Sequence, residues 1–230
     1  MLKKRNLPAC AKIPGVHFDL DKVKEQLSSL DGWGDVYETN SGITKFHDQK
    51  FIEALQTNDF REHSFTTLRP EFVSDDVDLV SLGSRKSEIY RNKHFKTEKL
   101  SPVGNEMNWD YPAEGYAGSY IQTEIARQFK AESCRVRMHW LVAGKTIEPH
   151  IDYDPSYGVR FVLPVAGTSG VINAFWPNNK REEYNLAADG SVYFLNTGYV
   201  HSVEHNGTED RIALLFTLKS QEDIECIALK

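Results

Sequence analysis

The sequence has few cysteines, no long apolar run and no excess of basic residues, and each absence excludes a class of protein. Its three cysteines, Cys10, Cys134 and Cys226, are odd in number and far apart, so neither a disulfide framework nor a thiolate zinc site is expected. No apolar stretch approaches the roughly 20 residues of a membrane helix, and residues 1–20 carry charges and prolines where a secretory signal would be apolar. We therefore expect a cytoplasmic protein without membrane contacts.

The charge balance is acidic. Lys and Arg number 27 against 33 Asp and Glu, a net charge of −6, so the chain lacks the basic field on which non-specific nucleic-acid binding depends. With 40% hydrophobic residues and 230 residues in all, it suits one globular domain. We expect a single domain, 1–230, with a mixed helical and irregular region (1–132), a catalytic core (133–220) and a tail (221–230).

The first half of the chain shows two helical patterns. Residues Asp19 to Leu30 have apolar side chains at spacings of three and four, and Asp19 or Asp21 can cap the helix start. The stretch from Ser119 to Lys130 places Ile121, Ile125, Ala126 and Phe129 on one face. Residues 31–115 are polar and irregular. We expect the two helices to buttress a sheet built from the second half of the chain.

From Ser133 onward, short apolar segments alternate with turns rich in Gly, Pro, Asn and Asp. Eight strands in under about ninety residues are typical of a mainly β jelly-roll, a double-stranded β-helix of the cupin type, whose two facing sheets enclose a site. The predicted strands are Cys134–Val142, Ile147–Ile151, Gly158–Val165, Val171–Trp176, Glu183–Leu186, Ser191–Leu195, Val200–His205 and Arg211–Leu218.

A candidate metal site comes from two of these strands. His150 and Asp152 are two residues apart at a strand end, so both side chains point to one face. His201 begins another predicted strand, which a jelly-roll can bring alongside. Two imidazoles and one carboxylate can occupy one face of a metal's coordination octahedron. This leaves three coordination positions open, the arrangement associated with non-haem Fe(II) and O₂. His205, which shares the strand face of His201, is the alternative third ligand.

Arg211 lies ten residues after His201, across an Asn206-Gly207 turn. A hairpin there would put its guanidinium on a neighbouring strand, close to the site beneath His201. A buried arginine needs an anion, and a dicarboxylate bound to the metal at its other end would supply one. Alternatively, Arg211 is a surface residue beside Glu209 and Asp210.

These motifs, in this order and spacing, resemble the 2-oxoglutarate/Fe(II)-dependent oxygenases, in particular the branch of aspartyl/asparaginyl β-hydroxylase-like proteins and bacterial proline hydroxylases. The resemblance runs from about Cys134 to Leu218, and residues 1–118 have no part in it. It is carried by Leu141-Val142-Ala143-Gly144 to Pro149-His150-Ile151-Asp152, by Arg160-Phe161-Val162-Leu163-Pro164-Val165, and by His201-Ser202-Val203 through Asn206 to Arg211.

The resemblance implies a set of roles. His150, Asp152 and His201 would be catalytic iron ligands, Arg211 would bind the distal carboxylate of 2-oxoglutarate, and Arg160 matches a second position that contacts the cosubstrate in the β-hydroxylase branch. The cofactors would be Fe(II), 2-oxoglutarate and O₂. Certain β-hydroxylases lack a carboxylate ligand, and its presence here as Asp152 argues against halogenation, which needs that position vacant.

Other residues are candidates for substrate contact. Arg137 and His139 alternate with apolar residues, so their face lines either the barrel interior or solvent. Tyr153, Trp176 and Asn196 border the predicted mouth, where they shape the site or simply pack. The basic segment 85–99 is either a flap over an acidic substrate or a solvated loop.

The expected function is therefore that of a dioxygenase. It would hydroxylate an aliphatic C–H bond of a free amino acid, a related small acid or a peptidyl amino-acid side chain, with release of succinate and CO₂. One competing hypothesis is a jelly-roll metal protein with non-oxidative, isomerase-type chemistry, which would not need Arg211. Another is a catalytically silent binding module that keeps the fold.

Overall fold

The computed structural model of the chain describes residues 1–28, 60–72, 105–113 and 115–229. Its first elements are η1 (Lys4–Asn6), β1 (Cys10–His17), α1 (Leu20–Ser28), β2 (Phe60–Ser64), β3 (Thr66–Thr67), η2 (Pro70–Phe72), η4 (Glu106–Asn108), β4 (Tyr111–Pro112) and α6 (Tyr120–Gln128). The second half contributes β5 (Ser133–Leu141), β6 (Thr146–His150), β7 (Val159–Ala166), β8 (Val171–Phe175), η5 (Pro177–Asn179), β9 (Glu182–Tyr184), β10 (Ser191–Leu195), β11 (His201–His205), β12 (Arg211–Leu218) and η6 (Glu222–Ile227).

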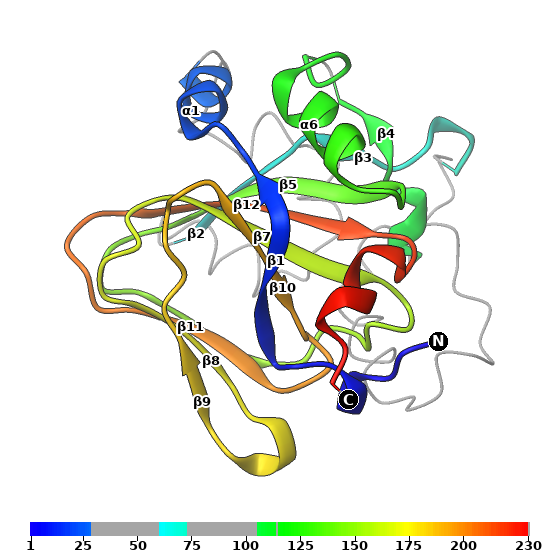
Figure 1. Ribbon diagram of the computed structural model, residues 1–230. Helices are drawn as coiled ribbons and strands as arrows, with labels where there is room; N and C mark the ends of the chain where they lie inside the picture. The colour runs from blue at the N-terminus through cyan, green and yellow to red at the C-terminus, as the bar shows by residue number, and fades with distance from the viewer. Residues whose placement is uncertain (29–59, 73–104, 114, 230) are drawn as a thin grey trace.

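The strands β5 to β12 form a jelly-roll, which confirms the predicted fold class. They are divided between a six-stranded sheet, in the order β1-β10-β7-β12-β5-β2, and a four-stranded sheet, in the order β6-β11-β8-β9 (Figure 1). All pairings are antiparallel. The eight predicted strands correspond to these eight, and their ends agree within two residues. The strands β1 and β2 at the two edges of the larger sheet were not predicted.

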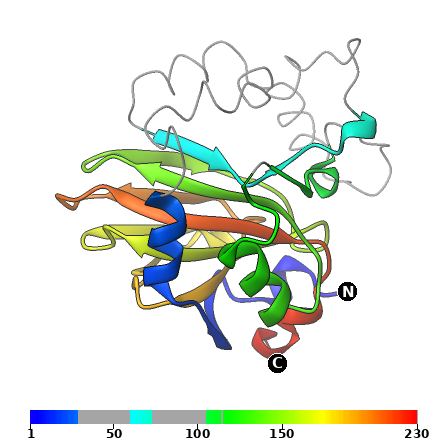
Figure 2. The ribbon, with the colours of Figure 1, turned by 90° about the horizontal axis from the view of Figure 1, so that it is seen from above.

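The outer face of the six-stranded sheet is covered by α1 and α6, which Figure 2 shows side by side in front of the sheet. Val23 and Leu27 of α1 and Ile121 and Ile125 of α6 are buried against apolar residues of β5, β7, β10 and β12. The predicted buttressing helices are thus present. Ala126, predicted on the packed face, is exposed instead.

The ends of both helices follow from their capping residues. The Asp19 carboxylate accepts hydrogen bonds from the backbone N–H groups of Asp21 and Lys22, and the Ser119 hydroxyl accepts one from Gln122. These bonds satisfy amide donors that have no partner within the helix. The first helix was predicted to reach Leu30. α1 spans Leu20–Ser28, and the predicted end at Leu30 lies outside the described residues.

A second apolar cluster lies between the two sheets. It includes Val162, Leu195, Ala213 and Leu215 from the larger sheet and Phe175 from the smaller one. Side chains alternate between the two faces of a strand, so residues two apart from these also point into the space between the sheets. By this alternation Arg211 on β12, next in the series to Ala213 and Leu215, faces inward.

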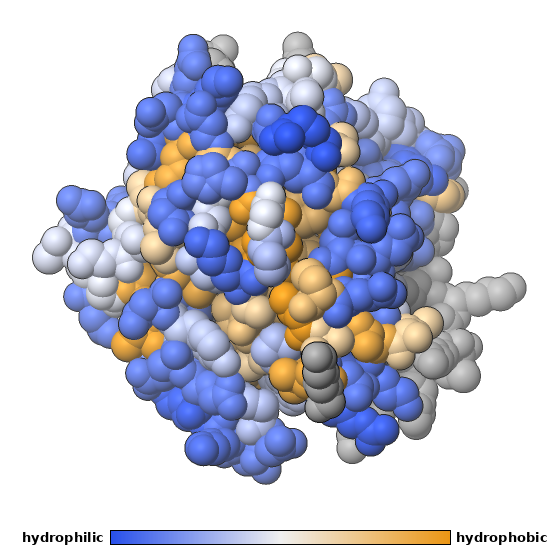
Figure 3. Space-filling view, in the orientation of Figure 1, coloured by the Kyte–Doolittle hydropathy of each residue, from blue (hydrophilic) through white to orange (hydrophobic). Residues whose placement is uncertain are grey.

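The two termini lie close together beside β1 (Figure 1). The backbone N–H of Leu229 donates to the carbonyl of Asn6, and the Gln221 side chain bonds both backbone groups of Leu2. Apolar residues gather in the middle of this face, around β1, with hydrophilic residues surrounding them (Figure 3). Within the described residues, no helix has the length and apolar character needed to cross a membrane.

Gly167 is expected to be essential for the β7–β8 turn. Its φ is +60°, and a Cβ there would lie 2.0 Å from the carbonyl oxygen of Asp210, the residue before Arg211. Gly144, with a φ of +77°, has no atom within 4 Å of such a Cβ. Gly144→Ala should therefore lower the free energy of unfolding by about 1 kcal/mol through backbone strain alone. Gly167→Ala should lower it by about 3 kcal/mol because the clash adds to the strain.

Urea denaturation of the two variants checks this expectation, with Gly144→Ala as the control for the left-handed backbone. Equal losses of stability in the two variants would contradict it, because the contact with Asp210 would then have no energetic consequence.

Candidate metal centre

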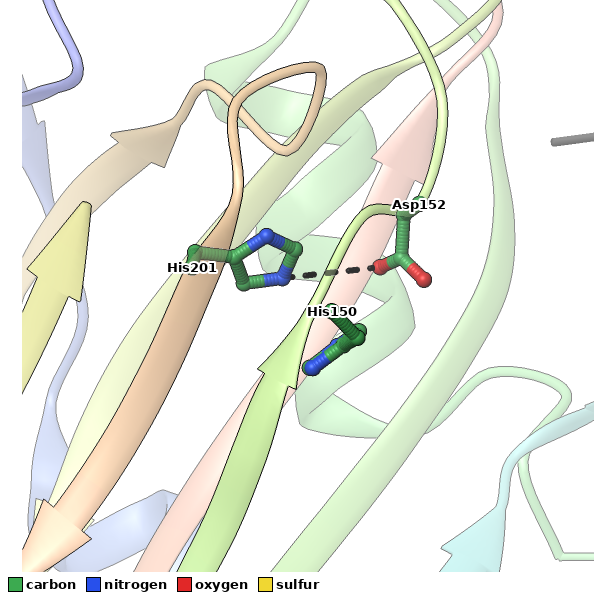
Figure 4. Close-up of side chains that lie close together, drawn as sticks. All are labelled: His150, Asp152 and His201. Carbon is green, nitrogen blue, oxygen red and sulfur yellow. Dashed lines mark ion pairs between the residues drawn. The ribbon is translucent and has the colours of Figure 1, made fainter. Parts of the chain in front are cut away.

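Three side chains converge (Figure 4): His150 at the end of β6, Asp152 just after that strand, and His201 at the start of β11. Each offers a ligand atom, and these atoms all lie within 4.8 Å of one another. Nε2 of His201 is 3.9 Å from Oδ2 of Asp152, and the two imidazole centroids are 4.2 Å apart. The structure thus brings together the three residues that the sequence predicted as a metal site.

Strand pairing and two loop contacts hold these residues opposite one another. His150 ends β6 and His201 begins β11, and the two residues are paired in the ladder between these strands. Asp152 lies just beyond β6, where its backbone N–H donates to the carbonyl of Thr197 at 3.0 Å. The Thr197 hydroxyl donates to the carbonyl of Tyr153 at 3.2 Å. The segment after β6 is therefore attached to the turn that precedes β11.

Both histidines are oriented by backbone carbonyls. Nδ1 of His150 lies 2.7 Å from the carbonyl oxygen of Glu148, and Nδ1 of His201 lies 3.1 Å from that of Tyr199. A carbonyl oxygen only accepts, so in the neutral ring the proton lies on Nδ1 and Nε2 has the lone pair. This is the tautomer in which histidines bind metals while a second group fixes the ring.

His201 is 7% exposed, and its burial lowers the pKa of the imidazole to about 4, although Asp152 acts in the opposite direction. The ring is therefore neutral at physiological pH. In the unfolded chain it takes up a proton near pH 6.5, so between about pH 6.5 and 4 the unfolded state binds more protons than the folded state. The metal-free protein should lose about 3 kcal/mol of stability across this interval as the pH falls.

Urea denaturation of metal-free protein between pH 4 and 7 measures this loss. The His201→Asn variant is the control, because it keeps a polar side chain that does not titrate. The variant should show a shallower dependence of stability on pH than the wild type. The same dependence in both proteins would show that His201 does not cause the loss.

The donor set fits a divalent transition metal. Two imidazoles and one carboxylate, with no further described ligand in the group, leave coordination positions open, which suits Fe(II) in non-haem oxygen chemistry. His150 and Asp152 are half-buried, and Ile151 between them is 41% exposed. The candidate site therefore lies where the interior of the barrel meets the surface.

His205, the alternative third ligand, is held by the turn that follows β11. Its Nε2 is 2.6 Å from the carbonyl oxygen of Glu209, and its Nδ1 accepts a hydrogen bond from the backbone N–H of Gly207 at 3.2 Å. Both ring nitrogens are thus engaged locally. His205 is not part of the convergent group.

Arg211 is buried, with an exposed fraction of 4%, and points between the sheets. Desolvation lowers the pKa of its guanidinium to about 10, so it remains charged at neutral pH. Within the described parts of the chain, no group accepts a hydrogen bond from its side chain or forms an ion pair with it. A buried cation without an anionic partner is costly, and it marks a place where an anionic ligand would be stabilised.

The surface alternative for Arg211 is wrong, and so is the predicted hairpin. Although β11 and β12 are consecutive, β11 pairs with β6 and β8, whereas β12 pairs with β5 and β7 in the other sheet. The Asn206-Gly207 turn crosses between the sheets because a jelly-roll alternates its strands. Arg211 therefore points from the larger sheet across the interior toward the smaller sheet, and its strand is not a hydrogen-bonded neighbour of β11.

Arg160 on β7 is 3% exposed and lies next to the candidate ligands. Its Nη1 is 3.6 Å from Oδ2 of Asp152, and its Nη2 contacts the hydroxyl of Tyr153 and, at 3.3 Å, Oε2 of Glu106. The Tyr153 hydroxyl donates to Oε2 of Glu106 at 2.6 Å and lies 3.0 Å from the Thr217 hydroxyl. Tyr153, predicted at the mouth, is thus buried beneath Asp152.

The remaining candidates fall in different places. Arg137 and His139 are buried, 6% and 8% exposed, and are paired with Leu215 and Ala213, so their face lines the interior and not solvent. Nε of Arg137 donates to Nε2 of His139 at 2.9 Å. Asn196 is fully buried, and its amide donates to the carbonyls of Lys4 and Pro8, so it anchors the N-terminal segment.

Trp176 follows β8 and is partly exposed, with the Arg181 guanidinium 5.4 Å from its ring centroid. The basic segment 85–99 lies outside the described residues. Glu106 was not singled out from the sequence: it lies in a short 3₁₀ helix within a region without apolar periodicity, so no local pattern indicated that it reaches the site.

Comparisons with known proteins find matches among solved structures. No family model and no curated protein matches the chain. An oxidoreductase of the 2OG-Fe(II) oxygenase family from Burkholderia pseudomallei is 14% identical, covers 92% of this chain and 84% of its own, and has a TM-score of 0.47. A cupin domain from Bordetella pertussis is 16% identical over 40% of this chain and 88% of its own, with a TM-score of 0.30. A non-heme alpha ketoglutarate dependent epimerase from nogalamycin biosynthesis is 16% identical over 36% and 44%, with a TM-score of 0.31.

Proposed function

We propose that the protein is an Fe(II)- and 2-oxoglutarate-dependent dioxygenase. It hydroxylates an aliphatic C–H bond of a free amino acid, a related small acid or a peptidyl amino-acid side chain. In each turnover one oxygen atom of O₂ enters the substrate as hydroxyl and the other enters succinate, formed from 2-oxoglutarate with loss of CO₂.

The observation that carries the proposal is the combination, in one barrel, of a three-residue ligand group with a buried guanidinium that has no anionic partner among the described residues. His150, Asp152 and His201 converge, and the Nδ1 atoms of the two histidines lie against backbone carbonyls, which leaves their Nε2 atoms for a metal. Arg211 presents a positive charge toward the space between the sheets, with no anion among the described residues to neutralise it. A metal ion alone would leave that charge uncompensated. A dicarboxylate that binds the metal at one end and Arg211 at the other satisfies both.

The protein's own residues bind and orient the reactants. His150, Asp152 and His201 would hold Fe(II), and Arg211 would fix the distal carboxylate of 2-oxoglutarate and so set the direction in which it enters. The bound metal, 2-oxoglutarate and O₂ together supply the oxidising chemistry for C–H hydroxylation. Arg137 and His139, on the inner face of β5, are positioned to contact a polar group of the substrate. Apolar residues between the sheets limit access of water.

The test is a screen for succinate release over the free amino acids and short peptides, with Fe(II), ascorbate, O₂ and 2-oxoglutarate. His150→Ala serves as the blank. We expect substrate-dependent succinate from the wild type only. Under anaerobic conditions, adding 2-oxoglutarate to the Fe(II) protein should produce a weak visible charge-transfer band.

The competing functions give different results in the same experiment. A metal protein with non-oxidative chemistry binds the cation but forms no succinate that depends on O₂. A silent binding module gives neither the band nor succinate. Either result would reject the dioxygenase.

A further inference from the structure

Glu106 lies outside the jelly-roll sequence but reaches its metal end. With Arg160 and Tyr153 it forms a group that we call the Glu106 cluster. Its Oε2 accepts hydrogen bonds from the Tyr153 hydroxyl at 2.6 Å and from Nη2 of Arg160 at 3.3 Å. Its Oε1 lies 3.9 Å from Nε of Arg135. The carboxylate is 13% exposed and Arg160 is 3% exposed, so this is a buried ion pair with a shared hydroxyl.

The position of Glu106 is tightly determined by its neighbours. Its backbone N–H donates to the Tyr157 hydroxyl at 2.9 Å, and the same hydroxyl donates to Oδ1 of Asn105 at 2.9 Å. Next to it, Met107 packs so closely on the chain that a Cβ at Gly158 would lie 2.6 Å from the Met107 Cε. The segment that carries Glu106 is therefore held against the loop between β6 and β7.

The far side of the Arg160 guanidinium faces a candidate ligand. Its Nη1 lies 3.6 Å from Oδ2 of Asp152, beyond the distance of a direct hydrogen bond. That oxygen is also the one that faces Nε2 of His201, at 3.9 Å. Arg160 thus lies between two carboxylates, and its closer contact is with Glu106.

We propose that Glu106 is a positioning residue for the metal centre: by holding Arg160 it keeps the guanidinium from forming a closer, bidentate pair with Asp152 that would compete with a cation for Oδ2. An arginine and a carboxylate form strong bidentate pairs when nothing prevents them, and such a pair would occupy the ligating oxygen. This inference rests on the proposed metal site and adds a residue from outside the barrel to it.

The experiment measures Co(II) binding to the full-length protein by calorimetry in wild type, Glu106→Gln, and the double variant Glu106→Gln/Arg160→Gln. The single variant should bind Co(II) about 10- to 100-fold more weakly, the usual cost of losing an outer partner of a metal ligand. The double variant should recover part of this loss, since no guanidinium remains to pair with Asp152. A purely structural role would make the double variant worse.

Glu124→Gln is the matched control. Glu124 is exposed to a similar degree, 15%, and pairs with Arg127 on α6, which packs on the outer face of the six-stranded sheet, away from the candidate ligands. It should bind Co(II) as the wild type does. Tyr153→Phe gives a second arm should Glu106→Gln fail to fold. It removes one hydroxyl from the Glu106 cluster, and weaker Co(II) binding is expected in a variant that still unfolds cooperatively.

Several outcomes would overturn the inference. Unchanged Co(II) affinity in Glu106→Gln, or in Tyr153→Phe when that is the folded variant, rejects it while leaving the metal site intact. Unchanged Co(II) affinity with weaker 2-oxoglutarate binding would assign Arg160 to the cosubstrate instead. Absence of Co(II) binding in the wild type would reject the proposed metal site itself, and the inference with it.

Discussion

Arg211→Met is expected to abolish measurable 2-oxoglutarate binding while leaving the unliganded protein as stable as the wild type, or more stable. The guanidinium is buried without an anionic partner among the described residues, so its desolvation is uncompensated until a ligand arrives. Methionine has a similar length and no charge to bury. Losing one partner of a buried charge pair costs about 2 to 5 kcal/mol, which corresponds to about a 30- to 5000-fold loss of affinity.

Thermal unfolding with and without ligand separates the two effects. Metal and 2-oxoglutarate together should raise the melting temperature of the wild type, because a ligand that binds only the folded state stabilises it. In Arg211→Met the starting melting temperature should be equal or higher. The part of the shift caused by 2-oxoglutarate should be lost, while the shift caused by the metal alone should remain. Arg127→Met, on the surface of α6, is the control and should keep the shift. A strongly destabilised Arg211→Met would mean that the guanidinium has a structural partner.

His201→Ala should lose metal binding by more than about 100-fold, beyond the cost of losing an outer partner, because it removes a ligand itself. His205→Ala is a close control: it removes a buried imidazole from the same strand, four residues further on. His205→Ala should bind Co(II) within about threefold of the wild type. It should unfold more easily, by about 1 to 3 kcal/mol, because Glu209 and Gly207 lose their partner.

Calorimetric titration with Co(II) and urea denaturation of both variants provide the two readouts. The expectation fails if the two variants lose metal affinity to the same degree, since the loss would then follow from damage to β11 and not from the missing ligand.

The jelly-roll could be predicted because its strands carry a local signal. Turn residues separate each apolar segment from the next, and β10 and β12 begin and end at the predicted residues. The ligand group was predictable for the same reason: His150 and Asp152 are two residues apart and so point to one face, and His201 begins a strand that the fold brings alongside. Short-range patterns therefore determined both the strands and the ligands.

Other features depend on contacts that no short-range pattern reveals. The turn at Asn206-Gly207 looks like a hairpin, but which sheet receives β12 depends on how all eight strands are arranged. The polar face of β5 could have been exposed, and only the facing sheet makes Arg137 and His139 interior residues. Glu106 joins the site through hydrogen bonds to residues about fifty positions later in the chain.

The hydrogen bond between the Asp152 amide and the Thr197 carbonyl keeps two distant parts of the chain together in the folded state, so a cation bound there would favour the folded over the denatured state. Asp152 and His201 are separated by 49 positions, and closing a loop of that length costs a flexible chain about 3 kcal/mol of entropy. The native backbone has already brought these ends together, whereas a denatured chain must still do so. A cation that bridges β6 and β11 would therefore discriminate against the denatured ensemble, and removing it with a chelator should speed proteolysis.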